Sequence, residues 1–177
     1  MTTSQEPHIA DLEKQFDAAK PAPKQPIQAV SIILSKGNLD MVYPALILAN
    51  GARMSGIEAT IFFTFWGLDA ITESKIDNLH VATVGNPAFP IPTMLGGLPG
   101  IESLASAYMR REIEKIEIPT VRELLQILSD SGAKLYACRM AMDMFNLKKT
   151  DLIPSVDGIL SVIDFFDHAA GSQLLFI

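Results

Sequence analysis

Hydrophobic residues in this chain form short continuous stretches, separated by longer segments in which they recur with helical spacing. Residues 28–34 and 57–63 are nearly continuous apolar stretches, typical of strands that are covered on both faces. Between them, residues 39–54 predict a helix that ends at Gly56, and Pro44 is tolerated within its first turns. Two such strands joined through a helix by short loops predict a parallel pair with a right-handed crossover.

The same alternation continues toward the C-terminus. Thr120 begins a predicted helix, with Glu123 at the capping-box spacing, and Gly132 ends it. Asn146 is a candidate left-handed cap for another helix. The complete set of further predicted elements is helices over 68–78, 100–116, 120–131, 139–145 and 158–169, strands over 79–84, 133–138 and 174–177, and a loop over 147–154.

Two segments depart from this alternation. Residues 7–19 predict a short amphipathic helix and 21–26 a stiff Pro-rich linker, so 1–26 is an appendage to a single α/β domain over 27–177. An apolar insertion spans about 85–118. No residue from 81 to 101 is charged, but prolines and glycines interrupt this stretch and prevent a continuous membrane-spanning helix. We expect it to pack on protein, which argues against membrane contact.

Composition narrows the class of protein and its surroundings. Hydrophobic residues make up 49% of the chain and charged residues 19%, which favours a homo-oligomer that buries apolar surface between its copies. A net charge of −6 without a basic run argues against nucleic acid as a partner. Acidic residues precede any long apolar stretch, so no signal peptide is expected, and a single cysteine suits a reducing, cytoplasmic location.

The only cysteine, Cys138, lies where the predicted strand 133–138 meets the next helix. The first N–H groups of a helix favour a thiolate, Arg139 adds a positive charge, and functional groups gather at the carboxyl ends of parallel strands. The alternative is an inert core cysteine that behaves as a small hydrophobe. The pattern leaves both roles open.

Four residues that follow the first two strands are candidate walls of a pocket near this thiol: Lys36, Asn38, Thr64 and Trp66. The loop 35–38 also raises the possibility of nucleotide binding, but it has neither GxGxxG nor GxxxxGK[ST]. Turn formation and helix capping are therefore the favoured roles of Lys36 and Asn38.

No cofactor or metal site is expected from the sequence. The three histidines are far apart, and none has ligand spacing with the cysteine or with a carboxylate: His8, His80 and His168.

Four stretches together resemble the DsrE/DsrF-like family of sulfur-relay proteins in its cytoplasmic form. They are VSIILSKGNLD, ATIFFTFWGL, PTMLGGLPGIESLASAYM and GAKLYACRMAMDMFNLKKTDLI, and YACRMAMDMF within the last is the most specific. The resemblance begins at about residue 28 and leaves the N-terminal segment outside it.

This resemblance implies a three-layer α/β fold, with a mostly parallel sheet of about five strands and helices on both faces. It also implies that Cys138 holds sulfane sulfur, received from a rhodanese or a TusA-like carrier and passed to a partner thiol, in a homo-oligomer. A second hypothesis is an oligomeric binding or scaffold protein of the same fold without sulfur transfer. A third is a flavodoxin-like protein that binds a small molecule at 35–38.

Overall fold

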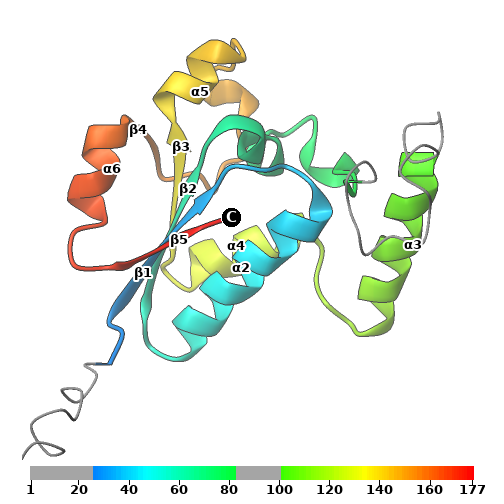
Figure 1. Ribbon diagram of the computed structural model, residues 1–177, viewed down its shortest axis with the longest axis horizontal. Helices are drawn as coiled ribbons and strands as arrows, with labels where there is room; N and C mark the ends of the chain where they lie inside the picture. The colour runs from blue at the N-terminus through cyan, green and yellow to red at the C-terminus, as the bar shows by residue number, and fades with distance from the viewer. Residues whose placement is uncertain (1–25, 83–100) are drawn as a thin grey trace, which may run out of the picture.

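A computed structural model describes residues 26–82 and 101–177 (Figure 1). The predicted N-terminal helix, nearly all of the linker and the Pro/Gly-rich part of the insertion lie outside these ranges. No helix of the described part is both long and apolar enough to cross a membrane.

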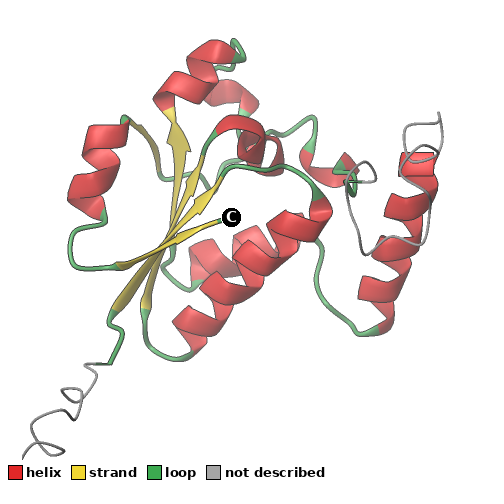
Figure 2. Cartoon of the chain, in the orientation of Figure 1, coloured by secondary structure: helices red, strands yellow, loops and turns green. Residues whose placement is uncertain are grey.

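Five parallel strands form one sheet in the order β4-β3-β2-β1-β5 (Figures 1 and 2). Their bounds are β1 Ala29–Leu34, β2 Glu58–Phe63, β3 Lys134–Cys138, β4 Gly158–Leu160 and β5 Gln173–Phe176. Ile32 lies beside Ile61, and Ile61 lies beside Leu135, so a buried apolar row crosses the centre of the sheet. Parallel strands buried on both faces require such continuous apolar sequence.

Helices cover both faces of the sheet, which confirms the predicted three-layer fold. Helices α2 (Leu39–Met54) and α4 (Val121–Asp130) lie on one face, and α6 (Val162–His168) lies on the other (Figure 1). Phe165 of α6 stacks on Phe62 of β2, with ring centroids 4.4 Å apart. The chain steps from β1 to β4 in one direction and returns to β5 in the other, so right-handed crossovers place α6 opposite α2 and α4.

Local signals account for the ends of several helices. The predicted capping box of α4 is confirmed: Glu123 N–H donates to Thr120 Oγ1 at 3.3 Å, and Thr120 N–H donates to the Glu123 carboxylate at 2.8 Å. These bonds from the Thr120 N–H and hydroxyl hold the pKa of Glu123 below its usual value. Asn146 takes positive φ after α5, as predicted, and Gly132, predicted to end the preceding helix, also has positive φ. The remaining helices are α3 Ile101–Lys115 and α5 Arg139–Met144.

The prediction of a strand over 79–84 is wrong for its described residues, 79–82, which are irregular. Leu79 and Val81 are buried, so they produce a strand-like pattern without strand pairing. The Val81 N–H donates to Ser106 Oγ of α3 at 2.9 Å, and His80 C=O accepts from the first N–H of α2. Side chains and a helix end therefore satisfy this backbone in place of a neighbouring strand.

Three other predicted boundaries also change. Residues 158–160 of the predicted last helix form β4, and the Ser161–Asp164 capping box begins α6 only after them. The predicted helix 68–78 consists of two 3₁₀ segments, η1 (Phe65–Ile71) and η2 (Ile76–Asn78). A third 3₁₀ turn, η3 (Lys149–Asp151), lies in the predicted loop 147–154. Short elements such as these carry too little periodicity to be distinguished from their neighbours.

Two glycines allow the loop after β1 to lie directly against η1. A Cβ on Gly67 would lie 2.1 Å from the Leu34 carbonyl oxygen, and a Cβ on Gly37 would lie 2.4 Å from the Trp66 carbonyl oxygen. The obstructing atoms are backbone, which cannot move aside as a flexible side chain does. Any side chain at either position forces the ends of β1 and β2 apart.

Gly67→Ala is therefore expected to lower the free energy of unfolding by about 1–3 kcal/mol through overpacking. Gly51→Ala is the matched control, because Gly51 lies inside α2 and a Cβ there meets nothing within 4 Å. This control should gain about 0.5–1 kcal/mol from helix propensity. Urea denaturation of both variants measures the difference, and equal stabilities would contradict the close contact at Gly67.

Candidate functional site

Cys138 is the last residue of β3 and the N-cap of α5, the junction expected from the sequence. Its backbone is extended, with φ −75° and ψ 118°, and it pairs with Leu160 at the end of β4. This places the thiol at the carboxyl end of the sheet, where α/β proteins gather functional groups.

The thiol is enclosed in the described conformation. Cys138 is 1% exposed, and its buried neighbours along the chain are Ala137, Ala141 and Met142. The expected hydrogen bond from the start of the helix to the sulfur is not formed, because the Cys138 side chain makes no cap bond to α5. A reagent or a partner thiol can reach the sulfur only after the surrounding elements open.

Apolar side chains are exposed on the helix that Cys138 caps and on η1, which packs beside it. They are large side chains that stay exposed to solvent: Phe65, Trp66, Met140 and Met144. Trp66 packs against Phe145 just after α5, with ring centroids 4.8 Å apart. Phe65 has φ +45°, a left-handed conformation that is rare for a bulky residue and is found at constrained sites. We call these four residues the η1–α5 surface.

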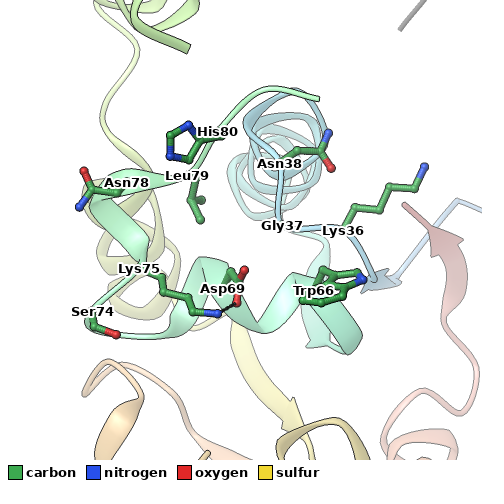
Figure 3. A pocket seen from close by; sticks show the side chains of 10 residues that line it. All are labelled: Lys36, Gly37, Asn38, Trp66, Asp69, Ser74, Lys75, Asn78, Leu79 and His80. Atoms are coloured by element: carbon green, nitrogen blue, oxygen red, sulfur yellow. Dashed lines mark hydrogen bonds and ion pairs between the residues drawn. The ribbon is translucent and has the colours of Figure 1, made fainter. Parts of the chain in front are cut away.

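The expected pocket walls divide between two places. Lys36, Asn38 and Trp66 line a cleft of about 440 Å³ at the carboxyl ends of β1 and β2 (Figure 3). Thr64 is buried and is not part of the cleft lining, and neither are Cys138 and Arg139. Trp66 connects the two regions, because it lines the cleft and also packs on Phe145.

The structure adds cleft residues that the sequence did not suggest. Seven further residues complete the lining: Gly37, Asp69, Ser74, Lys75, Asn78, Leu79 and His80. Most of them belong to 68–80, which was predicted as a regular helix and strand. Their periodicity gave no sign that the segment would fold as 3₁₀ turns around a cleft. The closest signal was their position after the second strand.

Arg139 interacts electrostatically with Asp164 of α6. Asp164 at the start of α6 has a pKa held below its usual value by the Ser161 hydroxyl and N–H, with smaller contributions from the charges of Arg139 and His168. Arg139 is exposed, so its charge is directed toward solvent and α6. Within residues 26–82 and 101–177, no group of three His, Cys, Asp or Glu side chains is placed to hold a metal ion.

Comparison with known proteins identifies the family. The model of the DsrE/DsrF/DrsH-like family matches residues 27–177. The chain belongs to this family. It is 33% identical over 153 residues to a protein named sulfur carrier protein DsrE2 from Allochromatium vinosum, covering 82% of this chain and 94% of that protein. It is 28% identical over 152 residues to the uncharacterized protein YrkE of Bacillus subtilis, covering 83% and 95%.

A solved structure supports the fold independently of sequence. The protein of unknown function MTH1491 from Methanobacterium thermoautotrophicum superposes with a TM-score of 0.52 at 8% identity, covering 84% of this chain and 98% of that one. At this identity the likeness concerns the fold alone. Membership of the family makes sulfur-relay chemistry the first function to consider for this DsrE/DsrF/DrsH-like chain.

Phe145→Ala is expected to increase the rate at which iodoacetamide alkylates Cys138. The aromatic contact with Trp66 contributes roughly 0.5–1.5 kcal/mol, so its loss raises the open population about two- to tenfold. Tyr108→Ala, on the exposed face of α3, is the control and should leave the rate unchanged. Mass spectrometry follows the modification. A wild-type protein that reacts as fast when folded as in urea would contradict the enclosed thiol.

Proposed function

We propose that this protein is a sulfur carrier that holds a persulfide on Cys138 and passes it to the thiol of a partner protein. The observation that carries the proposal is the 33% identity to a protein named as a sulfur carrier, over 94% of that protein. The sequence contains one cysteine, so a persulfide can form only on Cys138. The position of that cysteine at the end of a sheet strand agrees with a chemical role.

The transfer step conserves atoms and electrons. The Cys138 thiolate attacks the outer sulfur of a donor persulfide, a new S–S bond forms on Cys138, and the donor leaves as a thiolate. The acceptor thiolate then repeats the step on the Cys138 persulfide and releases the Cys138 thiolate. With no second cysteine in the sequence, an internal disulfide cannot end the reaction, so each transfer ends on a partner. Such a thiol functions in a reducing compartment, which favours the cytoplasm.

The enclosure of Cys138 makes opening part of the proposed mechanism. Helix α5 has six residues, and a helix this short depends on packing for its stability. The η1–α5 surface presents aromatic and methionine side chains, which are enriched where proteins bind one another. We propose that a rhodanese or a TusA-like carrier docks on this surface and displaces α5 from the thiol.

A binding or scaffold role is the second candidate, and the 1% exposure of Cys138 is the observation that favours it. In that case the thiol is a core residue and the η1–α5 surface alone contacts partners. The two roles differ in whether sulfur ever becomes bound to Cys138.

Incubation of the protein with inorganic polysulfide is expected to add the mass of one sulfur atom to the intact chain, and dithiothreitol should remove it. Cys138→Ser is expected to show no gain, because it lacks the sulfur that forms the bond. Phe145→Ala should increase the rate at which the sulfur atom is added. Intact-protein mass spectrometry measures all three. An equal gain in Cys138→Ser, or no gain in the wild type even with Phe145→Ala, would eliminate the carrier role.

We further propose that the protein is a homo-oligomer whose copies meet at α6 and β5. Ile163 of α6 is 76% exposed and Phe176 of β5 is 73% exposed, and Phe166 and Leu174 on the same two elements are also exposed. β5 is also an edge strand, so one side of its backbone has no neighbouring strand within residues 26–82 and 101–177. Large apolar side chains exposed on a helix and on a sheet edge are typical of surfaces that become buried between proteins.

Ile163→Asp combined with Phe176→Asp is expected to convert the oligomer to a monomer, because the interface would have to bury two carboxylates. Size-exclusion chromatography with light scattering gives the mass. The control is Ile47→Asp with Leu48→Asp, two exposed apolar positions on the outer side of α2. If the control dissociates the protein and the α6–β5 pair does not, the interface lies elsewhere. A monomeric wild type removes the proposal altogether.

A further inference from the structure

We infer that the cleft beside the β1–α2 loop binds a small anionic molecule that carries an aromatic or other flat apolar group. This inference concerns a site that does not include Cys138, and it stands or falls independently of persulfide transfer.

Three segments of the chain build the cleft. Lys36, Gly37 and Asn38 belong to the loop after β1, Trp66 and Asp69 belong to η1, and the segment around η2 ends in His80. In Figure 3, Lys36 and Trp66 lie on one side and Asn78 and His80 on the other, with the Lys75–Asp69 pair between them. A volume of about 440 Å³ falls within the range of small-molecule sites.

The charges of the lining favour an anion. The lining contains two lysines, Lys36 and Lys75, and a single carboxylate, Asp69, although the whole chain has a net charge of −6. Asp69 is occupied by Lys75, with 2.7 Å between Nζ and Oδ1. Lys36 forms no hydrogen bond or ion pair with any residue of 26–82 or 101–177. Its ammonium extends outward on the Trp66 side, and its rotatable chain can turn over the cleft.

The other lining groups suit the rest of such a ligand. Trp66 is 59% exposed and offers an apolar aromatic wall that a flat group can contact. Ser74 and Asn78 provide neutral hydrogen-bond donors around the opening, whereas the Asn38 amide already donates to the Asp40 carboxylate. A few polar groups set around an aromatic wall are the usual composition of a small-molecule site.

Trp66 also gives the cleft a built-in reporter. It is the only tryptophan of the sequence, so intrinsic fluorescence at tryptophan wavelengths comes from the cleft alone. A ligand that contacts Trp66 changes the emission directly, without a label.

The test is a fluorescence titration of the full chain with phenyl phosphate, compared with inorganic phosphate and with neutral benzyl alcohol. We expect a saturable change with phenyl phosphate, weaker binding of inorganic phosphate, and no saturable change with benzyl alcohol. Lys36→Gln should weaken phenyl phosphate binding about tenfold, because it removes a charged hydrogen bond. Lys36 is exposed, so this variant should fold normally.

Lys134→Gln is the matched control, since Lys134 pairs with Asp157 at the start of β3, the opposite end of that strand from Cys138. It should bind as the wild type does. Cys138→Ser should also bind normally, which separates this inference from the proposed carrier function. The inference is overturned by a titration without saturation, by equal binding of benzyl alcohol, or by Lys36→Gln and Lys134→Gln behaving alike.

Discussion

The positions of the cleft and of Cys138, both at the carboxyl ends of the strands, depend on one close backbone contact. Thr64 N–H donates to the Leu34 carbonyl at 2.9 Å, Gly67 N–H donates to the Ser35 carbonyl at 3.2 Å, and Gly67 lies against Leu34 with no room for a side chain. This contact fixes η1 on the loop after β1. It thereby fixes Trp66, which forms one wall of the cleft and packs on Phe145 beside the helix that Cys138 caps. Cleft and thiol therefore share one rigid support.

In the proposed carrier function, the enclosed thiol separates two requirements. Storage would need a persulfide protected from solvent and stray reductants, and a side chain with 1% exposure would provide that protection. Transfer needs access, and α5 has only six residues to hold the closed state. A short helix that covers the proposed sulfur-binding thiol would let a partner control when the thiol is exposed. The exposed Met140 and Met144 lie on that same element, where a partner can contact them.

The sequence predicted those features whose causes are local. Thr120 and Glu123 define the start of α4 by themselves, and the change from strand to helix pattern located Cys138 at its junction. The burial of Cys138 could not be predicted, because it depends on how η1 and α5 pack, and these elements are far apart in the sequence. Leu79 and Val81 suggested a strand since burial alone produces the same pattern. The position of Lys36 and Trp66 beside one cleft follows from the strand-end rule, whereas Lys75 and His80 enter it through an irregular segment.

The two edges of the sheet are unlike each other. β4 has three half-buried residues. In contrast, every residue of β5 is exposed, and three of its four residues are apolar: two leucines and one phenylalanine. Of the two edges in the described sheet, β5 is therefore the one with more exposed apolar surface. Two copies that join β5 to β5 about a twofold axis would form one continuous sheet across both molecules, with antiparallel pairing at the seam. Such a pair would bury β5 of both copies at the seam, so pairing through β5 would end with two molecules and would not continue into a fibre.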